Sequence, residues 1–306
     1  MALLYALLIL SLLVTLLLGF DADARRELKE AGAFRDGFKA VTLARAGVQA
    51  ARAVLRQDAL LDAQTGRPYD ALTDQWAMPI TGRPIGDGVV SASIEDERGK
   101  LNLNDLAVPA GNTRSSTILR FKRLFLLVQV DPLLVDAIAD WVDPDDIAEP
   151  AGAESSYYES LKPPYRASNS ALQTLDELHL VKGVTDAALL RLARYITVYP
   201  TIPDGLINLN TAHFAVIQVL DPRITSAMAS EVILGRPYRS LQDVDRVASL
   251  ESIAKELRLT GGYAVRSDHF SIRISATVNE VTKDSLAVVR RSGTTGETRL
   301  IHFRVE

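Results

Sequence analysis

The residues best suited to carry chemistry are acidic side chains gathered in one stretch of the chain. Residues 131–160 hold nine of the chain's 38 acidic residues and none of its 34 basic ones. Four of these carboxylates fall within the seven residues 140–146, whose sequence is DWVDPDD. Carboxylates packed this closely repel one another unless a cation lies between them. The spacing therefore indicates a candidate cation site.

The candidate ligands are all oxygen atoms, because no histidine lies in this stretch. Oxygen ligands suit a hard cation, and a flexible loop that offers several of them at uneven angles favours Ca²⁺ over Mg²⁺. The spacing is not that of an EF-hand loop. A solvated acidic loop that binds no ion is the alternative interpretation. The predicted ligands of a structural Ca²⁺ are Asp140, Asp143, Asp145 and Glu154, with Asp146 next.

Catalytic chemistry has little support in the sequence. No nucleophile-elbow, P-loop, zinc-protease or dinucleotide-binding motif occurs, and the chain has no cysteine. The four histidines, at positions 179, 213, 269 and 302, lack partners at motif spacing and are interpreted as surface or structural residues. Asp143 and Asp145 as a hydrolase pair form a weak alternative, because neighbouring acids in one loop seldom flank a substrate from two sides. We therefore expect no enzyme activity.

The composition limits the class of protein. With 306 residues, of which 47% are hydrophobic, the chain is long enough for about two domains with cores of their own. Its formal net charge of −4 lacks the basic excess typical of proteins that bind a phosphate backbone. No nucleic-acid partner is expected on this basis.

The N-terminus predicts a membrane helix. Residues 1–20 are apolar and uncharged, and a helix of that length spans the hydrocarbon core of a bilayer, roughly 30 Å thick. No basic residue precedes the run, and Gly19-Phe20-Asp21 is a poor cleavage site, so retention is favoured over removal as a secretory signal.

The apolar pattern continues beyond the membrane segment. Apolar residues recur at steps of three and four, which predicts that the same helix continues as an amphipathic one. An anchor followed by a separate helix is the alternative. The predicted stripe consists of Leu28, Ala31, Phe34, Phe38, Val41, Ala44, Val48, Ala51 and Leu55.

The remaining pattern predicts a small sheet interrupted by a helical insertion. Residues 88–94 alternate at period two, as do 270–278, and strands are also predicted at 286–290 and 300–305. A lone early strand needs a partner, so we expect it to pair with the late strands. The expected divisions are a transmembrane part at 1–20, a helix with first strands at 21–104, an inserted helical domain at 105–265, and C-terminal strands at 266–306.

The helical region contains an internal repeat. The sequences LNLN at 101–104 and INLN at 207–210 each place an Asn-Leu-Asn turn before a helical run. Each copy then presents a polar cap followed by Leu and acidic residues, at 170–178 and 238–244, as helix starts prefer. We expect two copies of one helical unit, with a structural role for the four asparagines.

Several segments together resemble a known family. They are the apolar helix that continues as an amphipathic one, RAGV at 45–48, ERGKLNLN at 97–104, DWVDPD at 140–145, GAE at 152–154, YY at 157–158 and INLNTA at 207–212. In this order they resemble the minor pseudopilin K of bacterial type II secretion systems over essentially the whole chain. The resemblance implies an α+β fold. A pilin-like long N-terminal helix would pack on a small antiparallel sheet, with an all-α domain of two helix-hairpin-helix or SAM-like units inserted between strands.

The same resemblance implies a structural role in protein secretion. It implies a single-pass inner-membrane protein with a periplasmic head at the tip of the pseudopilus, in a complex with the minor pseudopilins I and J, and calcium in the acidic region. Tyr5 stands where major pilins carry a glutamate that pseudopilin K typically lacks. The basic leader cut by prepilin peptidase does not precede Met1, so that peptidase is a partner only if a leader exists.

A second resemblance, over residues 207–247, is to the helix-hairpin-helix DNA receptors of competence systems. Those modules use a Gly-hydrophobic-Gly turn whose amides approach phosphate. Here the sequence DPRIT occupies the turn at 221–225, and KGV at 182–184 keeps one glycine. An acid and a proline are poor phosphate ligands. A membrane-anchored DNA receptor is therefore kept as the alternative function.

Overall fold

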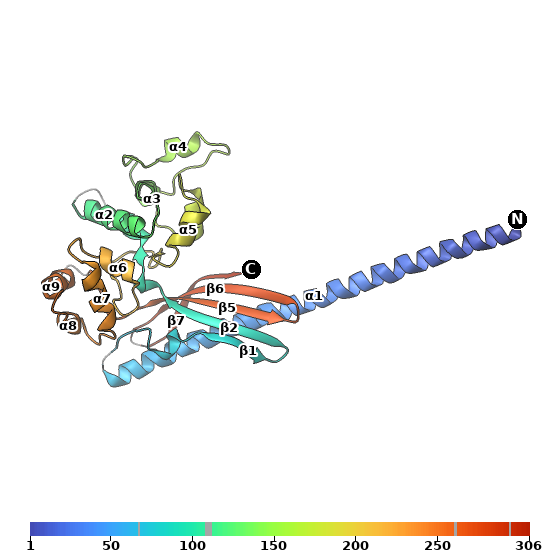
Figure 1. Ribbon diagram of the computed structural model, residues 1–306, viewed down its shortest axis with the longest axis horizontal. Coiled ribbons are helices and arrows are strands. Elements are labelled where there is room, and N and C mark those ends of the chain that lie inside the picture. Colours follow the sequence, from blue (N-terminus) through green and yellow to red (C-terminus); the bar gives the residue numbers. More distant parts are fainter. Residues whose placement is uncertain (67, 108–111, 260–261, 294) are drawn as a thin grey trace.

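The N-terminal helix α1 (Ala2–Thr65) dominates the shape of the molecule. In the computed structural model, which describes residues 1–66, 68–107, 112–259, 262–293 and 295–306, α1 is unbroken and ends at Gly66 in the left-handed region. Its N-terminal half extends away from the protein, and the other elements gather around its C-terminal half (Figure 1). Within the described chain it is the one helix long and apolar enough to cross a membrane. The prediction of one continuous helix is confirmed.

The buried stripe of α1 differs from the predicted stripe at its start. The later predicted positions are buried, namely Ala44, Val48, Ala51 and Leu55. Leu28, Phe34 and Phe38 are instead 74%, 81% and 70% exposed. The helix reaches the sheet only near Asp36, so Leu28 and Phe34 have nothing in this chain to pack against. Phe38 lies within the packed part of α1 but on a face that no other element covers.

Five antiparallel strands lie along one side of α1, in the order β1-β2-β5-β6-β7. The strands are β1 (Ile80–Ile85), β2 (Gly88–Asp96), β5 (His269–Val278), β6 (Val281–Arg291) and β7 (Thr298–Val305). Strand β2 pairs with β5 over its whole length, from Gly88 opposite Val278 to Asp96 opposite Phe270. The predicted pairing of the early strand with the C-terminal strands is therefore confirmed.

Two details of the sheet differ from the sequence prediction. Strand β1 was not expected, because Gly82 and Pro84 are typical of loops; it forms at the sheet edge, where the missing N–H of proline is tolerated. Strand β6 begins at Val281, directly after a tight turn, so residues 282–285 belong to the strand rather than to the expected turn. The sheet consequently has five strands instead of four.

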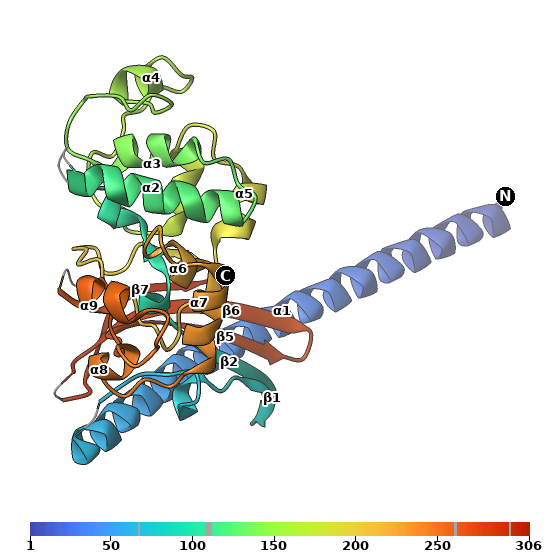
Figure 2. The same ribbon diagram turned by 60° about the vertical axis from the view of Figure 1, so that its left-hand side comes forward.

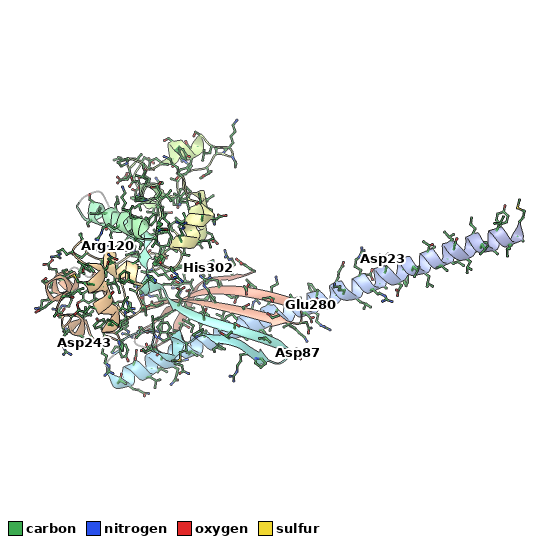
Figure 3. All side chains as sticks on the ribbon, in the orientation of Figure 1. Asp23, Asp87, Arg120, Asp243, Glu280 and His302 are labelled. Atoms are coloured by element: carbon green, nitrogen blue, oxygen red, sulfur yellow. The ribbon has the colours of Figure 1, made fainter. Side chains whose placement is uncertain are left out.

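The turns nearest the free half of α1 are tied to that helix. Lys39 Nζ donates to Asp87 Oδ2 in the β1–β2 turn at 2.7 Å, and Asn279 Nδ2 donates to Asp36 Oδ2 at 2.7 Å from the β5–β6 turn. Figure 3 shows Asp87 and Glu280 at this end of the sheet, while Asp23 lies on the uncovered part of α1. These contacts fix where α1 leaves the sheet.

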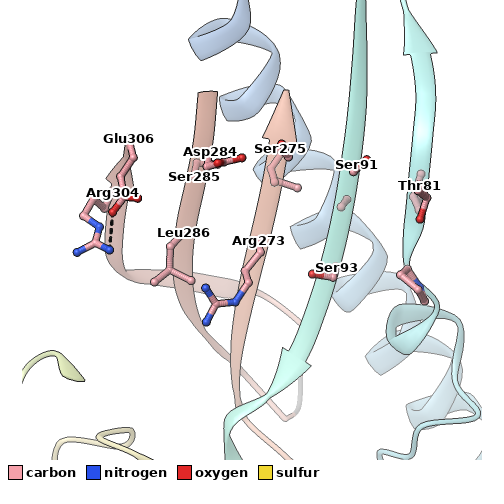
Figure 4. Close-up of a pocket in the computed structure, with 14 residues that line it drawn as sticks. Thr81, Ser91, Ser93, Arg273, Ser275, Asp284, Ser285, Leu286, Arg304 and Glu306 are labelled. Atoms are coloured by element: carbon pink, nitrogen blue, oxygen red, sulfur yellow. Dashed lines mark ion pairs between the residues drawn. The ribbon is translucent and has the colours of Figure 1, made fainter. Parts of the chain in front are cut away.

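The two faces of the sheet have different characters. The face toward α1 is apolar and includes Ile272, Ile274 and Ala287. A Cβ at Gly47 would lie 2.9 Å from Ile274, so glycine permits this close approach. The opposite face presents serines and charged side chains, with α1 behind the sheet (Figure 4).

A helical lobe lies beyond the end of the sheet that is farthest from the N-terminus (Figures 1 and 2). Its elements are β3 (Leu101–Asn102), η3 (Leu103–Ala107), α2 (Asn112–Leu127), α3 (Leu134–Val142), α4 (Ser155–Glu159), η4 (Leu175–Leu180), α5 (Asp186–Leu192), β4 (Ile196–Thr197), α6 (Phe214–Val219), α7 (Ser226–Leu234), α8 (Leu241–Val244) and α9 (Glu251–Leu259). Two short 3₁₀ turns, η1 (Gln75–Ala77) and η2 (Glu97–Gly99), flank β1 and β2. The expected division points between domains stay a prediction.

The lobe contains the same hydrogen-bond pattern twice. Asn104 Oδ1 accepts from the N–H of Leu172 at 2.7 Å, and its Nδ2 donates to the carbonyl of Leu172 at 3.1 Å. Asn210 makes the same two bonds to Tyr238, at 2.7 and 2.8 Å. The preceding asparagines act alike, because each accepts from the N–H two residues ahead. The predicted structural role of all four asparagines is confirmed.

Two further features coincide between the copies. Thr174 and Glu177 form a capping box two residues after Leu172, and Ser240 and Asp243 form one two residues after Tyr238. The first helical hairpin of each copy turns at an Asp-Pro pair, where Asp131 Oδ1 accepts from Leu133 N at 2.9 Å and Asp221 Oδ1 accepts from Arg223 N at 2.8 Å. The two halves of the lobe therefore follow one path.

Candidate metal centre

Helix α3 delivers the first acidic residues of the candidate site. Residues 135–142 are all buried, and the helix stops at Asp143 because the residue before a proline avoids the helical region. Asp143 accordingly takes extended geometry, with φ −79° and ψ 158°. The chain then turns back, and Glu154 begins the next helix, α4. Helix end and helix start are thereby brought together.

Three of the five predicted ligands form one cluster. Asp143, Asp145 and Glu154 each offer a carboxylate oxygen, and these oxygens lie within 4.8 Å of one another. Asp143 is fully buried and Glu154 is 6% exposed. Both carboxylate oxygens of Glu154 are buried without a hydrogen-bond partner among the described residues. Buried carboxylate oxygens without a donor need a cation or a proton.

The electrostatics agree with the geometry. Burial, followed by the charges of Asp140 and Asp143, raises the pKa of Glu154 to about 7. Oxygen ligands of this kind fit a hard cation such as Ca²⁺ and do not fit the soft metals that thiolates select. The carboxylate oxygens of Asp143, Asp145 and Glu154 are therefore suitable ligands for Ca²⁺.

Asp140 lies beside the cluster but contacts the loop backbone. Its Oδ1 and Oδ2 both accept from the N–H of Glu149, each at 3.1 Å. Burial raises its pKa to about 6, although these backbone donors oppose the shift. A Cβ at Gly152 would lie 1.8 Å from Asp140 Oδ2, so only glycine fits there. Asp140 thus shapes the turn at 149–152.

Asp146 lies at the edge of the cluster. Its Oδ1 accepts from Asn169 Nδ2 at 3.4 Å, and the same amide donates to the carbonyl of Asp145 at 3.3 Å. Asn169 N in turn donates to the carbonyl of Trp141 at 3.0 Å. Asn169 therefore links the loop at Asp145 and Asp146 to the end of α3.

Lys182 also contacts the turn at 149–152, a role that sequence reasoning missed. Its Nζ donates to the carbonyl of Gly152 at 2.9 Å and lies 5.1 Å from the centre of the Tyr157 ring. Its backbone N–H donates to Tyr158 Oη at 3.2 Å. From the sequence alone, KGV at 182–184 indicates only a hairpin turn. Tyr158 is 24 residues away in sequence, so no local spacing signalled the contact.

A second acidic cluster lies where α1 ends. Asp58, Asp70 and Asp74 have carboxylate oxygens within 4.8 Å of one another. Here a cation is already present, because the buried guanidinium of Arg291 pairs with Asp58 at 2.9 Å and with Asp70. Burial and the charge of Asp70 raise the pKa of Asp58 to about 7. Arg291 is more than 200 residues away from these acids in sequence, so no local spacing revealed the pairing.

The histidines have structural surroundings. His213 is the N-cap of α6, and its Nδ1 accepts from the N–H of Ala215 at 3.3 Å. His269 is buried, and its Nδ1 lies 2.7 Å from Asp268 Oδ1. Neither lies in the acidic cluster. Their interpretation as structural residues agrees with these contacts.

Comparison with known proteins identifies the family. The model of the family described as type II secretion system protein K matches residues 99–201. A type II secretion system protein K of Aeromonas hydrophila is 30% identical over 302 residues, which cover 92% of this chain and 89% of the relative. The chain belongs to the type II secretion system protein K family. A second relative, from Klebsiella pneumoniae, is 26% identical over 96% of this chain and 93% of its own length.

The fold of this chain is also found in a solved structure. The chain matches a protein in the crystal structure of the GspK-GspI-GspJ complex from the type 2 secretion system of enterotoxigenic Escherichia coli. The TM-score is 0.74 at 20% sequence identity, over 92% of this chain and 99% of the other. The predicted long N-terminal helix on an antiparallel sheet is thereby confirmed.

Membership of this family establishes the function in outline. The chain is a minor pseudopilin of type II secretion, and the DNA-receptor alternative is not favoured. The family is a structural component of the secretion system. The family match at 99–201 covers the first copy of the lobe, including Asp143, Asp145 and Glu154.

Proposed function

We propose that this chain assembles with the minor pseudopilins I and J and lies at the tip of the pseudopilus. The observation that supports this assembly is the solved GspK-GspI-GspJ complex, which contains a protein whose fold matches 92% of this chain. The exposed apolar residues of α1 outside the bilayer segment support it, because Leu28, Phe34 and Phe38 need a partner to leave water.

The shape of the protein supports a place at the tip. The lobe lies beyond the end of the sheet away from the N-terminus, where it adds bulk to the pilin-like part (Figure 2). In a shaft built from repeated close-packed subunits, a lobe of this size at every level would collide with the next subunit. At the tip no subunit follows, so the lobe is accommodated.

The membrane segment supports inner-membrane anchoring. An apolar window of α1 is entirely exposed in this chain, with a mean hydropathy of 2.7. Twenty apolar residues in a helix span the hydrocarbon core. The head then lies in the periplasm, and the helix passes into the pseudopilus bundle when the subunit assembles.

The acidic site is proposed to bind a structural Ca²⁺. Asp143, Asp145 and Glu154 would be its carboxylate ligands, and Asp146 lies next to them. Asp140 and Lys182 hold the backbone of the loop from two sides. Bound Ca²⁺ would supply charge neutralisation at the loop that joins the two hairpins of the first copy.

The lobe is proposed to consist of two helix-hairpin-helix units that serve protein contacts. In the first copy the hairpins are α2–α3 and η4–α5, and in the second they are α6–α7 and α8–α9. The turns at Asp131 and Asp221 present carboxylates where a DNA-binding hairpin would present amides to phosphate. This arrangement supports a scaffold rather than a nucleic-acid reader.

The proposed assembly is tested by co-purification. The full chain is expressed with the minor pseudopilins I and J of its own host and purified in a neutral detergent, beside a DNA titration at low salt. A stoichiometric ternary complex without DNA binding supports the proposal. A chain that elutes alone and binds DNA with strong salt dependence overturns it.

A further inference from the structure

Two arginines face each other across strands β6 and β7. Arg290 and Arg299 are direct cross-strand partners, and both are exposed. Direct cross-strand partners share one face of a sheet, and here it is the face opposite α1, because the alternating neighbours Val289 and Arg291 face that helix. Like charges directly opposite in a sheet destabilise it, with Cβ atoms about 5 Å apart. The chain tolerates this repulsion at the edge of a cavity.

The cavity lies between the sheet and the segments that join it to the lobe. It has a volume of about 830 Å³, and Arg266, Arg290 and Arg299 line it. Arg266 donates from Nη2 to the carbonyl of Gly293 and makes no ion pair among the described residues. These three residues are called the arginine pocket.

Of these three arginines, Arg290 alone has an acidic partner among the described residues, and that contact is long. Asp204 and Asp268 are both held by Arg98, at 2.8 Å for Asp268, which is also 2.7 Å from His269. Arg290 Nε approaches Asp268 Oδ2 only to 3.7 Å. Within the described residues Arg299 has no ion pair. The third acid, Glu297, is exposed and also has none among those residues.

Arg98 and Arg291 line the same cavity and show the contrast. Each is buried and engages two carboxylates of this chain, Asp204 and Asp268 for Arg98, and Asp58 and Asp70 for Arg291. Arginines that serve the fold are therefore paired internally here. In the arginine pocket, by contrast, Arg266 and Arg299 have no carboxylate partner among the described residues, and Arg290 has one at 3.7 Å.

We infer that the arginine pocket binds a carboxylate-rich segment of a partner protein. A guanidinium matches a carboxylate through two parallel N–H donors, and two neighbouring arginines fit successive acidic side chains. The cavity is far larger than a single phosphate ion fills. An incoming carboxylate would also relieve the repulsion between Arg290 and Arg299. The inference does not rest on the calcium site.

The test uses the full chain in a neutral detergent and a fluorescent hexaglutamate peptide as probe. Binding is measured at low salt and at about 0.3 M salt, where screening weakens surface electrostatics. Arg299→Glu is expected to weaken peptide binding about tenfold or more. The same change places a carboxylate opposite Arg290, so the melting temperature should rise by about 2 °C. That rise shows that the variant is folded.

Arg83→Glu is the matched control, because Arg83 is exposed on edge strand β1 at the other side of the sheet. It alters the net charge equally and should leave peptide binding unchanged. Equal loss in both variants would mean that net charge alone attracts the peptide, and unchanged binding in Arg299→Glu would exclude the pocket. Complete competition by inorganic phosphate at equal concentration would reassign the pocket to phosphate. Each of these three results overturns the inference.

Discussion

Lys182 Nζ donates to the carbonyl oxygen of Gly152 at 2.9 Å, and on the other side of the same turn Asp140 accepts from the N–H of Glu149. The lysine thus binds a backbone carbonyl and the aspartate binds a backbone N–H of one turn, residues 149–152. This turn leads directly into Glu154, the buried acid of the candidate Ca²⁺ site.

Lys182→Met should weaken Ca²⁺ binding about tenfold, because the turn before Glu154 loses its lysine contact and becomes mobile. Titration calorimetry on the full chain measures the affinity. Lys162→Met is the control, since Lys162 is exposed in the neighbouring loop and its removal changes the net charge equally. Loss of a positive charge alone would strengthen Ca²⁺ binding, so an affinity that is unchanged or that rises equally in both variants would contradict the positioning role of Lys182.

Asp143→Ala with Asp145→Ala should lower the melting temperature in Ca²⁺ and leave it nearly unchanged in EDTA. At a free Ca²⁺ concentration of about 100 times Kd, binding adds about 2.7 kcal/mol of stability, or roughly 5 °C or more for a protein of this size. Thermal melts of both proteins under both conditions measure the effect. A wild-type melting temperature that is the same with and without Ca²⁺ would remove the metal site from consideration.

Asp62→Asn should stabilise the protein at pH 8 but not at pH 4. Burial and the charge of Asp70 raise the pKa of Asp62 from its usual 3.8 to about 6. The folded state therefore holds more protons between these two pKa values, and stability falls as pH rises through about 4 to 6. Because Asp62 is partly exposed, the gain at pH 8 is about 1 kcal/mol.

Chemical denaturation at both pH values measures the gain for Asp62→Asn. Glu280→Gln is its control, because Glu280 is an exposed residue in the β5–β6 turn (Figure 3). A stabilisation that is equal at pH 4 and pH 8 would contradict the protonation argument.

Asn104→Ala and Asn210→Ala should destabilise the lobe by similar amounts. Each change leaves a buried N–H and a buried carbonyl without their partner, at a cost of about 2 kcal/mol. Asn→Asp at the same positions keeps the acceptor but sets a buried carboxylate against the carbonyl oxygen that Nδ2 contacts, so at pH 7 its cost should exceed that of alanine. Denaturant unfolding measures all four variants. A loss below about 0.5 kcal/mol at Asn210 would argue against equivalent roles in the two copies.

The sequence predicted those parts of the fold whose pattern is local. The period of α1 and the alternation of β5 appear directly in neighbouring residues, and the repeated Asn-Leu-Asn turns identified both copies of the lobe. Strand β1 was not predicted, because Gly82 and Pro84 normally indicate a loop, whereas an edge strand accepts them. The exposure of the first residues of the apolar stripe on α1 was not predicted for another reason. Periodicity shows an apolar face but not what covers it. Phe34 precedes the part of α1 that contacts the sheet, and Phe38 is exposed although Asp36 and Ala40 beside it are buried.

The candidate site divides in the same way. Asp143, Asp145 and Glu154 were predictable because they are close along the chain, and the structure brings them together. Lys182 was not predictable, because a later hairpin carries it back to the loop. The facing of Arg290 and Arg299 depends on the strand register set by the turn between β6 and β7, which a sequence pattern does not reveal.

The two copies of the lobe differ most between the first hairpin and the capping box. In the first copy residues 143–171 fill this connection and carry the acidic site, whereas in the second residues 235–237 suffice between α7 and Tyr238. One copy shows that the unit tolerates a long excursion at this point, and the other shows that it does not need one. The link at 235–237 is therefore a natural grafting point, at which a foreign loop or epitope can be presented from the second unit without interrupting either of its hairpins.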